Sequence, residues 1–206
     1  AVHLLLYAAD EAFNLGKVAS EIVLRIYLTI GFVALVILTA MAVTSTDGMI
    51  RRLGGKRWRR LHRFVYAAAL LGVIHFFMQV KADVDEPWVM AGLFGWLMGW
   101  RALQWLDLLG SRFAPWWPAT LAVLASLGTA VGEAVYYHLK LGAPVAQVLA
   151  ANLSFDLGWR PACVVLAIGL AVAAVAALRQ SKALAALLEP ARTPARVSLP
   201  VRGRNR

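Results

Sequence analysis

The stretch RRLGGKRWRRLHRFVYAAALLGVIHFFMQV, residues 51–80, joins a dense group of basic side chains directly to a long apolar run. A helix needs about 20 apolar residues to cross the hydrocarbon of a bilayer, and this run is about that long. His62 stands at its start and His75 lies deep inside it. Because an ionisable side chain within a membrane helix is costly, the stretch predicts a membrane span whose histidines have a function.

The composition of the whole chain agrees with a membrane environment. Of the 206 residues, 61% are hydrophobic and only 16% are charged, and eight are Trp. A soluble globule of this composition would expose too much apolar surface, and helices satisfy their own backbone hydrogen bonds in lipid. We therefore predict an all-α fold, a polytopic transmembrane helix bundle.

Hydropathy divides the chain into about five full spans. They cover residues 22–43, 61–80, 87–109, 116–139 and 161–178. The opening AVHLLLYAAD is apolar but too short to span, so we interpret it as the end of a truncated N-terminal helix. We expect a transmembrane core over residues 1–109, additional transmembrane helices over 110–180, and a basic, disordered tail over 181–206.

Basic residues predict the orientation of the spans. Six Lys or Arg residues lie between positions 51 and 60 and seven follow from position 179, whereas the alternate connections carry few. Because such residues stay on the cytoplasmic side, we expect the C-terminal tail in the cytoplasm. The same residues attract anionic membrane lipids, which accounts for the net charge of +10 without a nucleic-acid partner.

The spacing of the histidines is compatible with two redox centres. Neutral imidazole is a common axial ligand of haem iron. Thirteen residues separate His62 from His75 by about 20 Å along one helix and about 140° around it. His3 is expected at a depth comparable with His75, so these two could share one iron. The alternative is an interfacial His62 and packed, hydrogen-bonded His3 and His75.

Residues 44–83, TSTDGMIRRLGGKRWRRLHRFVYAAALLGVIHFFMQVKAD, resemble the ferric-reductase-like transmembrane family, in particular its haem-binding subunits of periplasmic methionine-sulfoxide reductase systems. The resemblance rests on the Arg-Arg-Leu-Gly, Leu-His-Arg and second His motifs, and it extends over about residues 1–105. It implies a b-type haem conduit with one or two haems, in which His3, His62 and His75 stand where the family places its ligands. FMN is a second cofactor that the resemblance suggests.

The resemblance also implies the partners and the location. In the family, a cytoplasmic flavin reductase or quinol donates electrons, and a periplasmic molybdopterin sulfoxide reductase accepts them. The expected location is the bacterial inner membrane, and the chain is expected to be an electron-transfer subunit without catalysis of its own. Arg59, Arg60 and Arg63 could pair with haem propionates or a flavin phosphate, although their role in orientation is sufficient to explain them.

Two features of the chain differ from the family. Two further helical stretches usually precede the matched region, and residues from about 116 to 206 extend beyond the usual short tail. In that extension Glu133 and Tyr137 share a helix face. They could form a proton-coupled quinone pocket, but an aromatic belt with an interfacial His138 and Glu133 is the favoured interpretation.

Two other functions stay open at this stage. One is a transmembrane ferric reductase or related oxidase with the same haem core and another acceptor, which needs a separate flavin and nicotinamide module because the short tail cannot supply one. The other is a non-redox membrane protein.

Overall fold

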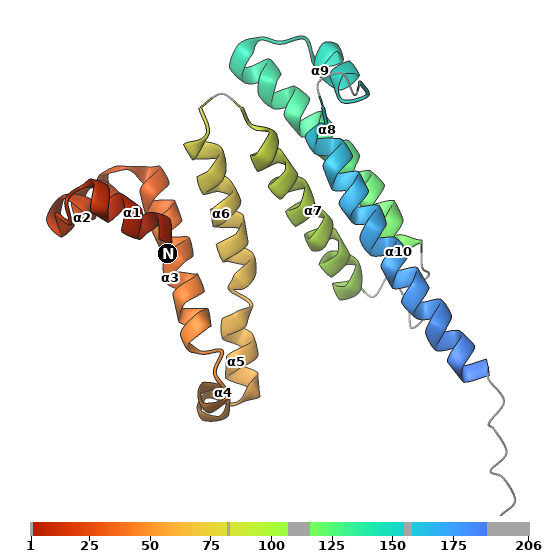
Figure 1. The fold of residues 1–206 in the computed structure, drawn as a ribbon, viewed down its shortest axis with the longest axis horizontal. Helices are drawn as coiled ribbons and strands as arrows, with labels where there is room; N and C mark the ends of the chain where they lie inside the picture. The colour runs from red at the N-terminus through yellow and green to blue at the C-terminus, as the bar shows by residue number, and fades with distance from the viewer. Residues whose placement is uncertain (1, 82, 107–115, 155–157, 189–206) are drawn as a thin grey trace, which may run out of the picture.

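A computed structural model describes residues 2–81, 83–106, 116–154 and 158–188 of the chain. These residues form helices and connections without a strand, which confirms the predicted all-α class. Figure 1 shows the long helices running side by side. In chain order the helices are α1 (Val2–Asp10), α2 (Leu15–Leu24), α3 (Ile26–Val43), α4 (Asp47–Leu53), α5 (Gly55–His62), α6 (Val65–Gln79), α7 (Asp85–Trp105), α8 (Trp117–Leu141), α9 (Val145–Ala151) and α10 (Pro161–Leu188).

Four stretches of helix are long and apolar enough to cross a membrane. They are Ile26–Val43, Gly55–Gln79, Trp117–Leu141 and Pro161–Arg179. Most of their large apolar side chains point away from the rest of the chain, as expected of helices that face lipid. The stretch expected at 87–109 forms α7, which has 21 residues but is not among the four. Residues 107–109 lie outside the described part.

The first span begins later than the sequence suggested. Residues 22–24 belong to α2, and the chain leaves helical geometry at Arg25, whose φ is −106° and ψ is 106°. Arg25 pairs with Glu21 at 2.9 Å, so the charged end of α2 stays outside the apolar helix. The span therefore starts at Ile26 instead of residue 22.

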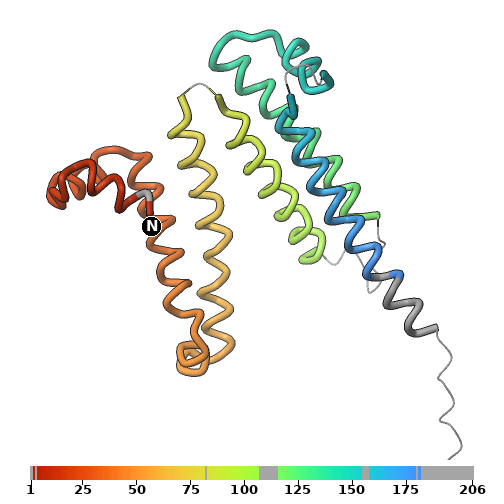
Figure 2. The backbone as a smooth tube through the Cα atoms, viewed as in Figure 1, coloured from red at the N-terminus to blue at the C-terminus, as the bar shows by residue number. Residues whose placement is uncertain are grey.

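The basic segment that precedes α6, the helix of His75, forms two short helices. Gly54 separates α4 from α5 with a φ of +71°, a backbone conformation that favours glycine. A tight turn then separates α5 from α6: the amide of Phe64 donates to the carbonyl of Leu61, and that of Tyr66 to the carbonyl of Arg63. The predicted helix over 61–80 is thus two helices that continue one another (Figure 2).

The long helices pack in two groups (Figure 1). In one group α3 packs against α6, and in the other α7, α8 and α10 pack against one another, whereas α6 and α7 make fewer contacts. Small residues allow the close approach in the second group. Thr129 and Val165 occupy the space that a side chain at Gly92 would need, and the ring of Trp88 does so at Gly132.

The last helix continues past the expected start of the tail. α10 extends from Pro161 to Leu188, so the position 181 chosen for the tail boundary lies within a helix. Residues 189–206, the rest of the predicted tail, lie outside the described residues.

Candidate functional site

The ring of His75 lies between α6 and α3. Its Nδ1 atom is 2.8 Å from the carbonyl oxygen of Tyr27, in the first turn of α3. One turn further, the ring covers Gly31, where an added Cβ atom would be 2.6 Å from its Cε1 and 2.7 Å from its Nδ1. Only a glycine leaves room for the imidazole at this place on α3.

The hydrogen bond to Tyr27 defines the tautomer of the His75 ring. A carbonyl oxygen can only accept, so Nδ1 carries the hydrogen and donates it. In neutral imidazole the lone pair then resides on Nε2. A histidine that binds a metal through one nitrogen usually donates the other N–H to a carbonyl or carboxylate, which orients the ring. His75 has this arrangement.

A cavity next to His75 brings in the first helix of the chain. It measures about 100 Å³, and its walls include Leu4 and Tyr7 of α1, Phe32 of α3, and Gln79 of α6. α1 therefore lies beside His75, as the predicted pairing with His3 requires. The backbone of His3 lies in α1, but its side chain is outside the described residues, so the pairing itself stays a prediction.

His62 has different surroundings at the end of α5. Its ring stacks on Trp58 with 4.0 Å between the ring centroids and 26° between the planes. Its Nε2 atom is 3.3 Å from the hydroxyl oxygen of Thr44. That hydroxyl lies 2.8 Å from the carbonyl of Ala40, to which it donates, so it can still accept a hydrogen from His62. His62 is half-buried and engaged by two neighbours.

His62 and His75 stand on separate helices. His62 is the last residue of α5, and His75 lies in α6 beyond the turn at Arg63 and Phe64. The turn contains hydrogen bonds from residue i+3 to residue i, which wind the backbone more tightly than an α-helix. The predicted angle of about 140° assumed one regular helix and does not hold across this turn.

The three arginines expected near a cofactor are exposed. Arg59 and Arg60 lie in the last turn of α5, and Arg63 follows the helix. Within the described residues none of them is in an ion pair with a carboxylate. Cations near a helix C-terminus interact favourably with its dipole, which supplies a structural reason for two of the three. Their pairing with propionates or phosphate stays a prediction.

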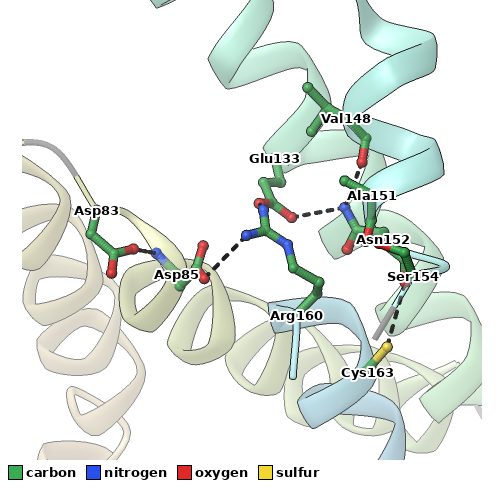
Figure 3. Close-up of polar contacts among 9 residues, drawn as sticks. All are labelled: Asp83, Asp85, Glu133, Val148, Ala151, Asn152, Ser154, Arg160 and Cys163. Carbon is green, nitrogen blue, oxygen red and sulfur yellow. Dashed lines mark hydrogen bonds and ion pairs between the residues drawn. The ribbon is translucent and has the colours of Figure 1, made fainter. Parts of the chain in front are cut away.

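A second polar cluster joins the helices of the other group (Figure 3). Glu133 of α8 is fully buried and forms an ion pair with Arg160, just before α10. Asn152 donates to the second oxygen of Glu133 at 3.0 Å, and Arg160 also reaches Asp85 of α7 at 3.4 Å. The cluster ties together α7, α8, α10 and the segment after α9.

This cluster changes the interpretation of Glu133. The sequence suggested an interfacial residue or part of a quinone pocket, but the structure buries its carboxylate against Arg160. Tyr137 instead lines a cavity of about 310 Å³ together with Arg160. His138 lies at the end of α8, where its Nδ1 donates to the carbonyl of Ala143 at 3.0 Å. The ionisable residue within a span indicated the cluster, but its partner Arg160 was not recognised.

Burial also acts on Asp85, the half-buried carboxylate of the cluster. It raises the pKa of the Asp85 carboxyl above its usual value, because the desolvation of the charged form outweighs the attraction of Arg160. One oxygen of Asp85 and the Nε atom of Arg160 are buried without a hydrogen-bond partner.

The donor set near α3 and α6 suits a histidine-bound group better than a free metal ion. Among the described residues, no three His, Cys, Asp or Glu side chains gather closely enough to hold a metal ion. A haem needs only one or two protein ligands, and the oriented His75 on its glycine cradle fits such a ligand. The adjacent cavity of about 100 Å³ is smaller than the roughly 300–1,000 Å³ of typical cofactor pockets.

Known proteins resemble this chain over part of its length. Residues 1–73 match the family described as ferric reductase like transmembrane component. A protein from Rhodospirillum rubrum named protein-methionine-sulfoxide reductase heme-binding subunit MsrQ is 52% identical over 101 residues, which are 48% of this chain and 49% of that protein. Proteins of the same name from Xanthomonas campestris and Azospira oryzae are 46% identical over 85 residues and 38% identical over 117 residues.

The matches cover 41% and 56% of this chain and 38% and 48% of those two relatives. The chain therefore spans about half the length of the curated relatives it matches, or less. No solved structure matches it. The apolar helices and the family together make this a multi-pass membrane protein. Residues 1–73 of the chain are thus similar to the ferric reductase like transmembrane family, and the matched part of the chain is similar to the MsrQ proteins.

Proposed function

We propose that this chain is a b-type haem electron-transfer subunit of a bacterial inner membrane. It passes electrons from a cytoplasmic flavin reductase or quinol to a periplasmic molybdopterin methionine-sulfoxide reductase. The observation that carries the proposal is the orientation of His75, whose Nδ1–H donates to the carbonyl of Tyr27 at 2.8 Å. The name of the relatives, which describes them as haem-binding subunits, supports the cofactor.

The residues of the chain have separate roles in this function. His75 would supply a nitrogen ligand to a bound haem, and Tyr27 and Gly31 hold its ring in place. His3 on α1 is the proposed second ligand of the same iron, and His62 is the proposed ligand of a second haem or, with one haem, a packed residue. A bound haem would supply one-electron transfer, and the apolar side chains around it would influence its potential.

The remaining cofactor contacts are assigned to the basic end, which we define as residues 51–63. Arg59, Arg60 and Arg63 are exposed there and present guanidinium groups that match carboxylate or phosphate geometry. We propose them as partners of haem propionates or of an FMN phosphate. The cytoplasmic side is assigned to this end and to the C-terminal tail because basic residues stay on that side.

A set of three histidine variants tests the ligands. The full chain is expressed with excess haem, purified, and measured by absorbance and EPR during a redox titration. We expect His75→Ala to lose the low-spin haem signal and His3→Ala to lose it as well. His138→Ala is the matched control, because His138 bonds to a loop carbonyl outside this site. A wild-type protein without Soret absorbance would instead support a non-redox membrane protein.

A second experiment distinguishes the acceptors. Haem-loaded protein is reduced anaerobically by a flavin reductase or by quinol and then mixed with a methionine-sulfoxide reductase or with a ferric chelate. Faster reoxidation by the sulfoxide reductase is expected. Faster reoxidation by the chelate would assign the chain to the ferric reductases, which the family match also allows.

A further inference from the structure

A cavity with a cation in its wall lies between α6 and α7. It measures about 450 Å³ and has one wall from each helix. Figure 1 shows that the two helices meet near their connection and spread apart toward their other ends. The cavity therefore opens where the two helix groups make few contacts.

The lining of this groove is apolar along its length and polar at one end. Ala69 of α6 and Phe94 and Leu97 of α7 contribute apolar surface, and Arg101 and Gln104 contribute polar groups from the last turns of α7. Leu97 is 53% exposed, so an apolar surface stays uncovered by the chain itself. An occupant must offer a long apolar part and a head group that suits a cation.

The polar end of the groove coincides with the expected membrane surface. Trp105, the last residue of α7, is 85% exposed, and exposed Trp residues gather at the level of the lipid head groups. α6 begins directly after the basic end and runs antiparallel to α7, so its first turn lies at the same end. Arg101, one turn before Trp105, is thereby placed at head-group depth.

The charge of Arg101 is not neutralised by the described residues. Its side chain is exposed and donates to Gln104 at a long distance of 3.4 Å, and no described carboxylate pairs with it. A guanidinium group binds phosphate through two parallel hydrogen bonds and is favoured for that reason. Basic pockets between membrane helices are known to bind anionic head groups.

We propose that the groove between α6 and α7 binds an anionic phospholipid. The phosphate of its head group pairs with Arg101, and an acyl chain lies against Ala69, Phe94 and Leu97. The lipid fills the space between the two helix groups and contacts both of them. It thereby stabilises the packing of α6 against α7, which make few direct contacts. This inference does not depend on haem binding.

Native mass spectrometry of the full chain in detergent tests the head-group preference. The protein is titrated with phosphatidylglycerol or with phosphatidylcholine that has the same acyl chains. One basic residue near a membrane surface contributes about 1 kcal/mol toward an anionic lipid, which corresponds to about fivefold tighter binding of phosphatidylglycerol. Equal binding of the two lipids by the wild type would overturn the proposal.

Three variants locate the site. Arg101→Gln should abolish the fivefold preference, whereas Arg179→Gln removes an exposed arginine of α10 outside the groove and should retain it. Ala69→Trp should fill the apolar wall and weaken the binding of both lipids. Circular dichroism confirms that each variant is folded. A preference for phosphatidylglycerol that survives Arg101→Gln would refute the proposed lipid site. A neutral quinone bound in the groove, or a dimer of the chain in light-scattering measurements that covers the groove, would refute it as well.

Discussion

Replacing Gly31 by alanine tests the structural basis of the haem proposal. A Cβ atom at this position would be 2.6 Å from Cε1 of His75, whereas ordinary contacts begin at 3.4 Å. The imidazole must therefore move by about 0.8 Å. A shift of that size is enough to stretch its 2.8 Å hydrogen bond to the carbonyl of Tyr27 beyond the usual limit.

The expected cost of Gly31→Ala combines two effects. Extra volume in a packed site costs about 1–3 kcal/mol, and a buried donor without a partner costs about 1–3 kcal/mol. Alanine favours helices over glycine by about 1 kcal/mol, which offsets part of this. We expect a net destabilisation of about 1–5 kcal/mol and a larger relative loss of haem, because the ligand nitrogen is no longer oriented.

Gly72→Ala is the matched control for this experiment. Gly72 lies in α6, the helix of His75, three residues before it, and a Cβ atom there would meet nothing within 4 Å. We expect Gly72→Ala to leave the haem spectrum unchanged and to be as stable as the wild type or more so. Thermal melting in detergent and the Soret absorbance per protein are measured for both variants. Equal haem content and equal melting temperature in the two variants would refute the claim that Gly31 makes room for the ring of His75.

Three other substitutions test the remaining features. Arg160→Met leaves the buried carboxylate of Glu133 unpaired, so we expect a loss of about 3–5 kcal/mol in SDS-induced unfolding, and a loss below 1 kcal/mol would show that the ion pair is not needed. Asp85→Asn removes a carboxyl whose pKa is raised by burial, so that the folded state favours its protonated form. The stability of the wild type should therefore fall as the pH rises from about 4 through that raised pKa. The melting temperature of Asp85→Asn should not show this fall. Gly54→Ala forces a side chain into a conformation with φ of +71° and should cost about 1–3 kcal/mol, seen as faster proteolysis between α4 and α5, whereas Gly48→Ala, in open space, should not.

The sequence predicted the helices much better than their interruptions. Long apolar runs identify spans because every span must satisfy the same requirement for length. The break at Arg25 had a signal in hindsight, since Glu21 and Arg25 form a charged pair that lipid would not accept. The turn at Arg63 and Phe64 had none, because neither residue is a glycine or a proline.

The sequence identified histidines as candidate ligands, but not the residues that contact them. His75 stands out as an ionisable residue in an apolar helix. The carbonyl of Tyr27 that orients it is a backbone atom 48 positions away, and such an acceptor leaves no mark in a sequence. Gly31 is one of 16 glycines in the chain, and only the packing of α3 on α6 distinguishes it. The partner of Glu133 was missed for the same reason, because Arg160 reaches it only through the fold.

The two helix groups use their polar residues in opposite ways. In the cluster of α7, α8 and α10, Glu133 and Arg160 form an ion pair with each other, and this pair holds the helices together. Beside α3, the imidazole of His75 is oriented by one carbonyl and bordered by an apolar cavity, with its Nε2 bearing the lone pair. An oriented imidazole is the kind of side chain that ligates haem iron, whereas a buried ion pair resists any change because separating it exposes an uncompensated charge. Redox chemistry is therefore expected from the first group, and substitutions in the second should reduce stability before they alter the haem spectrum.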